Sequence, residues 1–279
     1  MLVVKTLPLM FLWYITAVVV LTASGFSQTA GPTPEQFTEK NSAAKQFIEQ
    51  ANRCETANAR CRIAAFTKAI ETAPTFAEGY YGRAITYRAA GDNAKAIEDF
   101  SKVIDLDPKS GQAFFSRATL LASKMDLAAA IADFDKAAEL LPDSSPVFLG
   151  RGNAHLRSRH YGQANADFNR VLELDPKSAE GYYGRGSVAF FRNDSEKAAE
   201  DYTKAIELEP RLAVAFLNRA KCMELQGKDV EAIADLTKFI DLQPLDVQGY
   251  DARAPIYERL GEKDKAEADR QKATELRRH

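Results

Sequence analysis

The chain has 279 residues, and its charge is nearly balanced, with 37 Lys and Arg against 39 Asp and Glu and a formal net charge of −2. A nucleic-acid-binding protein would show a basic face or stripe, and no stretch of this sequence accumulates enough positive charge to predict one. The length would allow one or two globular domains, but an internal repeat predicts a different organisation.

Residues 1–25 show the pattern of a secretory signal peptide. Lys5 supplies the charged start, residues 7–21 form an apolar run, and the small residues Ala23 and Gly25 precede a cut that would follow Gly25. We therefore expect an exported protein, periplasmic or secreted. Removal of the segment takes away only Lys5 among the charged residues, so the charge balance of the mature chain barely changes.

The alternative for the same segment is an uncleaved membrane anchor formed by residues 7–21. This run is about 15 residues long and contains Pro8, whereas a helix that spans a bilayer usually needs about 20 apolar residues. The pattern therefore favours cleavage over anchoring. No other part of the chain is expected to contact a membrane.

A short segment of small and polar residues, 26–33, follows the expected cut and is interpreted as a linker. Thr33 then offers a hydroxyl N-cap, Pro34 suits the first turn of a helix, and Gln36 stands at the capping-box position. We expect the first helix to begin here and to end near Arg53.

From residue 43 onward the chain repeats with a period of 34 residues. The clearest marker is a proline that recurs at this spacing: Pro74, Pro108, Pro142, Pro176, Pro210 and Pro244. With this proline at position 32, the seven units are 43–76, 77–110, 111–144, 145–178, 179–212, 213–246 and 247–279. A strict period of this size predicts stacked units that contact only their neighbours, without one central core.

Each central unit is expected to form two helices joined by a tight turn. Positions 1–14 and about 17–30 have helical periodicity. Position 15 holds residues suited to the left-handed conformation that ends a helix: Gly91, Asn193, Gly227 and Gly261. Proline at position 32 ends the second helix, because the residue before proline avoids the helical region.

Four further positions predict how the two helices pack. Position 8 is Ala or Gly and position 20 is Ala from the second unit on. The aromatic residues at position 4 are Tyr80, Phe114, Phe148, Tyr182, Phe216 and Tyr250, and those at position 24 are Phe66, Phe100, Phe134, Phe168 and Tyr202. Small residues let the helices approach closely while the rings fill the space beside them.

This pattern resembles the tetratricopeptide repeat, a helix–turn–helix unit with a large residue at position 4, small residues at 8 and 20, an aromatic at 24 and proline at 32. The resemblance covers residues 43–279. It implies an all-α fold, a right-handed superhelical solenoid of about seven repeats over residues 34–279. The end units depart from the pattern, with Arg62 at position 20 of unit 1 and Pro255 inside the first helix of unit 7. Such degeneracy is expected where a terminal repeat has one face in water.

Two charged positions recur in units 2–7 without exception, Arg at position 7 and Asp at position 23. The pairs are Arg83 and Asp99, Arg117 and Asp133, Arg151 and Asp167, Arg185 and Asp201, Arg219 and Asp235, and Arg253 and Asp269. In an antiparallel hairpin that turns near position 15, these positions stand level with each other. We therefore predict a structural ladder of Arg–Asp ion pairs within the hairpins, in preference to a ligand site.

Two of the three cysteines could form a disulfide. Cys54 and Cys61 lie at the end of one expected helix and the start of the next. A disulfide between them would suit an oxidising compartment, and two unpaired thiols are the alternative that the sequence leaves open. Cys222, at position 10 of unit 6, is expected to remain a buried thiol.

No motif predicts catalysis, a metal site or a cofactor. His155 and His160 lie on different expected elements and lack the spacing of a zinc site, so His155 is interpreted as a packed core residue. The glycines beside Arg151 and Arg185 lie in the middle of expected helices with no preceding strand, which argues against a phosphate-binding loop. We expect neither an enzyme nor a small-molecule substrate.

The resemblance implies a protein-binding scaffold whose first helices line a concave groove for a partner's peptide or helix. The family's carboxylate clamp needs Lys at position 5, and this chain never has Lys there. The mostly apolar and aromatic residues at position 5 favour apolar peptide surface instead. The groove candidates in units 4–6 are Leu149, Asn153, Leu156, Tyr183, Phe190, Phe191, Leu217, Asn218 and Lys221.

Unit 5 carries two aromatic residues at positions 12 and 13, Phe190 and Phe191, where most other units include a polar residue. These rings either anchor a partner in the groove or pack against the turns of a neighbouring unit. The alternative function is a structural subunit of an envelope or secretion assembly, held by its outer faces.

Overall fold

The computed structural model describes residues 34–55 and 58–278, with side chains from residue 38 onward. The predicted signal peptide, 1–25, and the linker, 26–33, lie outside this part. The described residues form fourteen α-helices and no strand. None of these helices is both long and apolar enough to cross a membrane.

Each unit contributes a first and a second helix. The first helices are α1 Pro34–Arg53, α3 Ala77–Ala89, α5 Gly111–Ser123, α7 Ser145–Arg157, α9 Ala179–Phe191, α11 Ala213–Leu225 and α13 Val247–Arg259. The second helices are α2 Ala59–Thr72, α4 Asn93–Leu106, α6 Leu127–Leu140, α8 Tyr161–Leu174, α10 Ser195–Leu208, α12 Asp229–Leu242 and α14 Lys263–Leu276. The predicted bounds of the first helix are confirmed, and α13 is continuous through Pro255.

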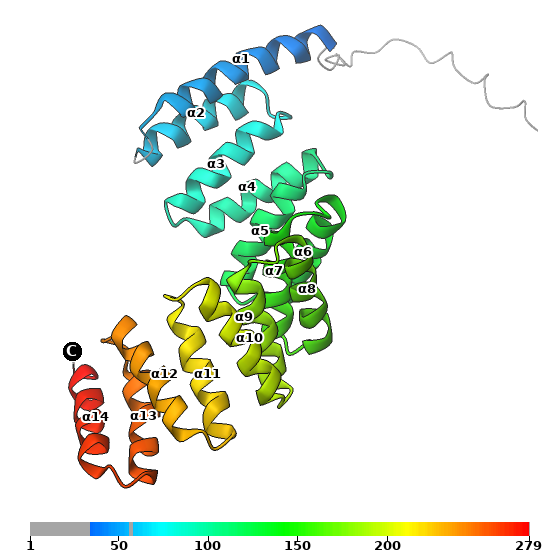
Figure 1. The fold of residues 1–279 in the computed structure, drawn as a ribbon. Coiled ribbons are helices and arrows are strands. Elements are labelled where there is room, and N and C mark those ends of the chain that lie inside the picture. The colour runs from blue at the N-terminus through cyan, green and yellow to red at the C-terminus, as the bar shows by residue number, and fades with distance from the viewer. Residues whose placement is uncertain (1–33, 56–57, 279) are drawn as a thin grey trace, which may run out of the picture.

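The hairpins stack into a solenoid that curves in an arc from α1 to α14 (Figure 1). Each helix packs against the helices before and after it in the chain, and several first helices also touch the first helix of the next unit. The predicted all-α fold, a right-handed superhelical solenoid, is confirmed. Because contacts are confined to neighbours, each unit depends on the adjacent units for its stability.

A left-handed residue at position 15 ends each first helix in units 2–7. Gly91, Gly227 and Gly261 have φ of 82°, 72° and 81°, and Asn193 has 62°, as predicted. The next N–H bonds back to the carbonyl five residues earlier, as from Asp92 to Tyr87 at 2.9 Å, which is the Schellman arrangement. The sequence did not predict that Met125 and Arg159 also take this conformation, with φ of 65° and 60°. The same turn therefore forms without glycine.

The aromatic ring at position 24 is held between two small residues, one from its own unit and one from the next. Phe168 is fully buried. A Cβ added to Gly152 in the same unit would lie 3.0 Å from this ring, and one added to Gly184 in the following unit would lie 2.3 Å from it. The glycines beside the repeated arginines thus serve close packing, because a side chain there would displace the ring.

All six predicted Arg–Asp pairs are brought together in the structure. In unit 2 the Arg83 Nε and Nη2 atoms each lie 2.8 Å from an oxygen of Asp99, a two-pronged contact that recurs in units 3–7. The carboxylates are between 4% and 9% exposed. The hydrogen bond to Asp99 raises the pKa of the Arg83 guanidinium. A buried carboxylate with a two-pronged arginine partner is well compensated for its lost hydration.

Each of these six guanidinium groups has a third contact, which reaches into the preceding unit. The Nη1 atom donates a hydrogen bond, 2.8–3.2 Å long, to the side chain at position 25 of that unit. In chain order the acceptors are Thr67, Ser101, Asp135, Asn169, Thr203 and Thr237. Each arginine therefore bonds to residues 16 positions on either side of itself. The ladder was predicted within hairpins only, and the structure shows that it also links successive hairpins.

Unit 1 lacks both the arginine and the aspartate of the ladder. Its two helices are instead joined by a disulfide between Cys54 and Cys61, whose Cα atoms are 6.0 Å apart. Arg62, which replaces the alanine at position 20, has a buried Nε with no hydrogen-bond partner. This end of the solenoid thus lacks two of the contacts that the inner units share.

We expect Gly184→Ala to destabilise the solenoid by ~1–3 kcal/mol, because the new methyl group would overlap the buried Phe168 ring. Gly162→Ala is the matched control, since nothing lies within 4 Å of a Cβ there. Alanine at that helical position is expected to be neutral or to stabilise by about 0.5 kcal/mol. Chemical denaturation of both variants measures the difference. Equal stabilities would contradict the packing described for the ring.

The two carboxylates on Arg151 allow a matched double-mutant test of the ladder. Its Asp167 partner has a side chain that is 5% exposed, and its Asp135 partner one that is 51% exposed. The coupling energy measured by denaturation should be about 2 kcal/mol or more for Arg151 with Asp167. For Arg151 with Asp135 it should be about 0.5 kcal/mol, as at exposed pairs. Additive effects for Arg151→Ala and Asp167→Ala would show that the ladder contributes little.

Candidate protein-binding groove

The predicted groove residues lie on three successive first helices, α7, α9 and α11. At position 5, Leu149 and Tyr183 are half-buried, so each presents part of its surface. At position 9, Asn153 and Lys221 are exposed. These four side chains give the face an apolar floor with polar groups beside it, which is the composition that peptide-binding surfaces commonly have.

Leu217 is the exception among the predicted groove residues. It is only 5% exposed and belongs to a core cluster with Phe239 and Tyr250. A side chain held in this cluster presents little surface to a partner. We therefore leave it out of the candidate surface.

A small polar network lies beneath the face in units 5 and 6. The Asn218 side-chain amide donates to the Tyr183 hydroxyl at 3.0 Å, and the buried Tyr202 hydroxyl donates to Ser187 Oγ at 3.2 Å. Burial raises the pKa of both phenols, so they remain neutral at physiological pH. The Asn218 bond thus ties the half-buried Tyr183 ring of unit 5 to unit 6.

The neighbouring rings of Phe190 and Phe191 have different environments. Phe190 is half-buried and packs against a cluster that includes Tyr202 and Cys222. Phe191 is 55% exposed, and its ring stacks on Tyr161, with centroids 5.9 Å apart and an interplanar angle of 9°. One ring therefore contributes mainly to the core, while the other presents about half of its surface to solvent.

Two titratable side chains in this region are shielded from solvent. Cys222 is fully buried and unpaired, and burial raises the pKa of its thiol to about 11, so it remains protonated. His155 is 9% exposed, and burial lowers the pKa of its imidazole. Both are packed side chains, as the sequence predicted.

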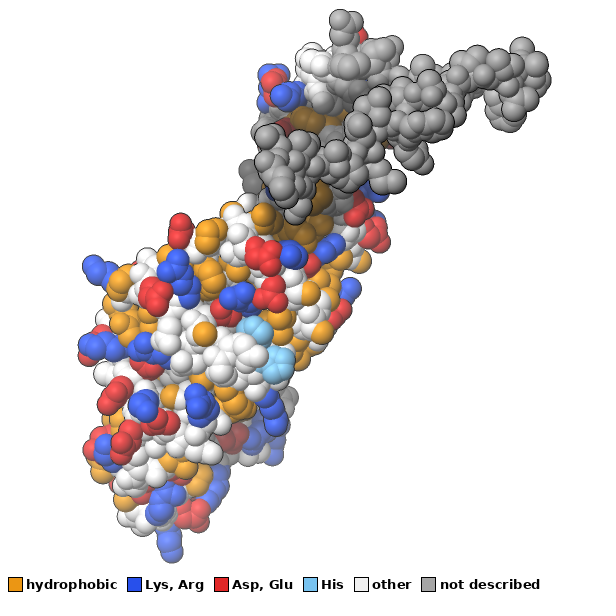
Figure 2. Space-filling view, turned by 90° about the vertical axis from the view of Figure 1, so that its right-hand side faces the viewer, with side chains coloured by type: hydrophobic (Ala, Val, Ile, Leu, Met, Phe, Trp, Pro, Cys, Tyr) orange, Lys and Arg blue, Asp and Glu red, His pale blue; other side chains and the backbone are white. Residues whose placement is uncertain are grey.

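The histidine pair was not predicted. The His155 Nδ1 atom lies 3.4 Å from that of His160, because the tight turn returns the chain to the end of α7. His160 is the exposed member of the pair, and Figure 2 shows histidine side chains in pale blue at the surface. The described residues contain no group of three or more side chains that could hold a metal ion. No metal site is assigned to the pair.

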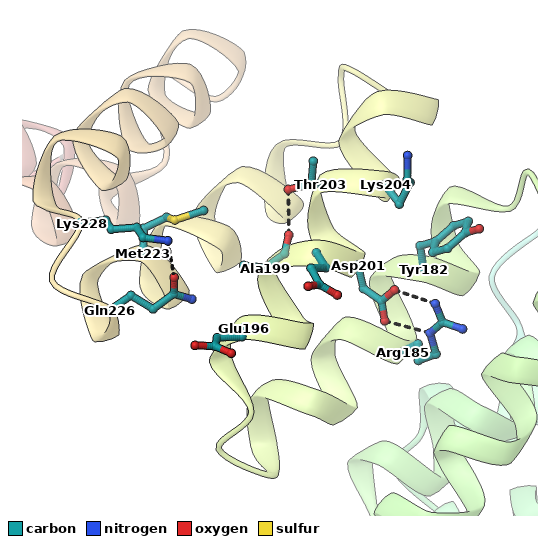
Figure 3. Close-up of a pocket in the computed structure, with 11 residues that line it drawn as sticks. Tyr182, Arg185, Glu196, Ala199, Asp201, Thr203, Lys204, Met223, Gln226 and Lys228 are labelled. Atoms are coloured by element: carbon teal, nitrogen blue, oxygen red, sulfur yellow. Dashed lines mark hydrogen bonds and ion pairs between the residues drawn. The ribbon is translucent and has the colours of Figure 1, made fainter.

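An open hollow lies between α9, α10 and α11 (Figure 3). Arg185 and Asp201, which face it, are bonded to each other as part of the ladder, and Lys228 bonds to Gln226 at 2.8 Å. Glu196 also lines the hollow, at the start of α10. The side chains drawn there include no nucleophile with an adjacent base, and nothing in the described residues shows enzymatic activity.

Comparison with known proteins gives a consistent family assignment. Family models of the tetratricopeptide repeat match residues 63–111, 81–145, 149–212 and 214–245. A comparison with curated proteins gives no match.

Solved structures share the fold. A tetratricopeptide repeat protein from Parabacteroides merdae is 19% identical, with a TM-score of 0.64, and the match covers 87% of this chain and 93% of that one. YrrB, described as a TPR protein with an unusual peptide-binding site, is 23% identical, with a TM-score of 0.58 and coverage of 68% and 97%. MamA is 25% identical, with a TM-score of 0.53 and coverage of 57% and 92%. Since the family models match more than half of the sequence, this chain belongs to the tetratricopeptide repeat family.

Proposed function

We propose that the chain is an exported scaffold that binds a peptide or helix of a partner protein along the first helices of units 4–6. The observation that carries this proposal is the exposed ring of Phe191. It is positioned by stacking on Tyr161, yet more than half of its surface remains free. Large aromatic side chains held in place at low entropic cost are frequent anchors in protein interfaces.

A second exposed apolar side chain extends the surface into the next unit. Leu225 occupies the same position in α11 that Phe191 occupies in α9, and it is 70% exposed. Half-buried Leu149 and Tyr183 lie on the same face of their helices, at position 5. A partner lying across α7, α9 and α11 could contact all of these in order. The shared fold with YrrB, described as having a peptide-binding site, is consistent with a peptide as the partner.

Export is supported by the cysteine pair and by the sequence of residues 1–25. The disulfide between Cys54 and Cys61 joins α1 to α2 in unit 1, which lacks the ladder. Disulfides persist in oxidising compartments and are rare in the cytosol. A periplasmic or secreted location therefore accounts for both features.

The groove is tested with partners crosslinked to the protein in its native envelope and identified by mass spectrometry. Phe191→Ala should weaken binding of an identified partner by ~2 kcal/mol with the melting temperature nearly unchanged. Leu245→Ala is the matched control, because Leu245 is 79% exposed but lies between α12 and α13. Phe190→Ala should mainly lower the melting temperature. Weaker binding in the Leu245 variant alone would support an assembly held by its outer faces.

Export is tested on protein recovered from the natural host. Intact-mass measurement should show a chain that begins just after residue 25, and non-reducing peptide mapping should show Cys54 bonded to Cys61. Cys222 should react with alkylating reagents only after unfolding, since its pKa is about 11 and its side chain is buried. A full-length chain extracted from membranes would instead establish the anchor formed by residues 7–21.

A further inference from the structure

One edge of the solenoid carries cations without ion-pair partners. We define the turn strip as positions 9–17 of units 2–6, which comprise the end of each first helix, the turn and the start of the second helix. Seven exposed basic residues of the strip form no ion pair with any described residue: Arg88, Lys124, Arg157, Arg159, Arg192, Lys221 and Lys228. These cations come from five consecutive units, so they gather only when the units stack.

The carboxylates of the turn strip are already engaged. Asp92 pairs with Lys95 at 2.7 Å, and Asp194 pairs with Lys197 at 2.8 Å. Asp126 accepts a hydrogen bond from a backbone N–H of α6 at 3.3 Å. Glu224 and Asp229 both bind the same guanidinium, that of Arg259, at 3.2 and 2.7 Å. None of these five carboxylates forms an ion pair with the seven free cations.

Exposed apolar side chains lie among these cations. Met125, Phe191 and Leu225, in units 3, 5 and 6, are 61%, 55% and 70% exposed. The Arg157 guanidinium donates to the Ala122 carbonyl at 3.0 Å and contacts the Met125 sulfur, which connects units 3 and 4 across the strip. Exposed apolar residues also occur at the opposite edge, as at Leu245, but those of the turn strip stand among unpaired cations. Exposed apolar groups rimmed by polar residues are typical of an interaction surface.

The opposite edge, formed by the loops between units, shows that this arrangement is not general. Its exposed cations include Lys109, Lys177 and Arg211. Each stands two residues after a carboxylate, and Asp107 and Asp175 accept hydrogen bonds from the backbone N–H groups of Lys109 and Lys177 at 3.1 and 3.0 Å. These three cations form no ion pair with a described residue either, but carboxylates outnumber cations in these loops, which also hold Glu209, Asp143 and Asp246. In the turn strip, by contrast, cations outnumber carboxylates.

We infer that the turn strip binds an acidic, amphipathic segment of a partner protein. The carboxylates of the partner segment would neutralise the free cations, and the apolar side chains of the segment would cover Phe191 and Leu225. This inference rests on the proposed function, since it names the chemistry of the partner that the same face takes. Complementary charge also speeds association and excludes basic partners. The whole chain is slightly acidic, with a net charge of −2, so the excess is local to this edge.

A protein segment fits the strip better than an anionic membrane surface. The strip also holds carboxylates, among them Asp126, which forms no ion pair with a described residue, and a flat anionic surface would meet these as well as the cations. A narrow segment can place its acidic residues only where the cations stand. Membrane-binding basic regions, in contrast, gather several lysines or arginines in one short stretch or on one helix face.

The test uses a display library of random peptides selected on the purified mature protein. We expect the selected peptides to be enriched in Asp and Glu next to aromatic or aliphatic residues, and their binding to weaken markedly with added salt. Reversing three strip charges with Lys124→Glu, Arg159→Glu and Arg192→Glu should weaken these peptides about tenfold or more. The matched control, Lys109→Glu, Lys177→Glu and Arg211→Glu, should change binding by less than about twofold.

Each other outcome overturns the inference. Selected peptides without acidic enrichment, bound equally well by both triple variants, would contradict the acidic partner while leaving the peptide-binding function standing. The absence of any selected peptide would count against both. Phosphatidylglycerol vesicles that bind the protein through the same three cations, without competition from acidic peptides, would identify a membrane surface in place of a protein segment.

Discussion

The three-way contact of the repeated arginine is the interaction on which the rest of the solenoid depends. One guanidinium binds the buried aspartate of its own hairpin and a side chain of the preceding hairpin, as Arg185 does with Asp201 and Asn169. Removing it would leave a carboxylate without compensation in a position that water barely reaches. The pairing of the two helices in a unit and the register between units are therefore set by the same group.

The two ends of the ladder differ in what holds their helices together. Unit 1 contributes only Thr67, which accepts a hydrogen bond from Arg83 of unit 2. A disulfide between Cys54 and Cys61 joins the two helices of unit 1. In unit 7 the Arg253 guanidinium keeps both kinds of ladder contact, to Asp269 and to Thr237. Arg270 and Arg277 there pair with Glu258 and Asp251 of α13. Unit 1 thus has a disulfide in place of the ladder, whereas unit 7 keeps the ladder contact and adds exposed ion pairs.

Sequence periodicity predicted the helices, the turn residues and the Arg–Asp pairs because each recurs at a fixed position. It missed the third contact of the arginine, since the acceptors are chemically mixed: Thr, Ser, Asp and Asn occupy the same position in different units. It also could not separate Phe190 from Phe191, because adjacent helical residues of one type differ only in the direction they face. Leu217 was wrongly predicted to face the groove for a related reason. Its burial depends on side chains of the neighbouring unit, such as Tyr250, which its position within the repeat does not reveal.

The contrast between periodic and irregular positions also distinguishes the ladder arginines from the free cations of the turn strip. The ladder arginines occupy position 7 in every unit from the second on, as a repeated packing problem requires. The free cations of the turn strip instead stand at positions 9, 12, 13, 14, 15 and 16, with no position held throughout. A requirement of the fold would impose one position on all units. Residues such as Arg159 and Arg192 gather at one edge without sharing a position, so the fold does not require them, and the acidic partner inferred above would lie across several of these units.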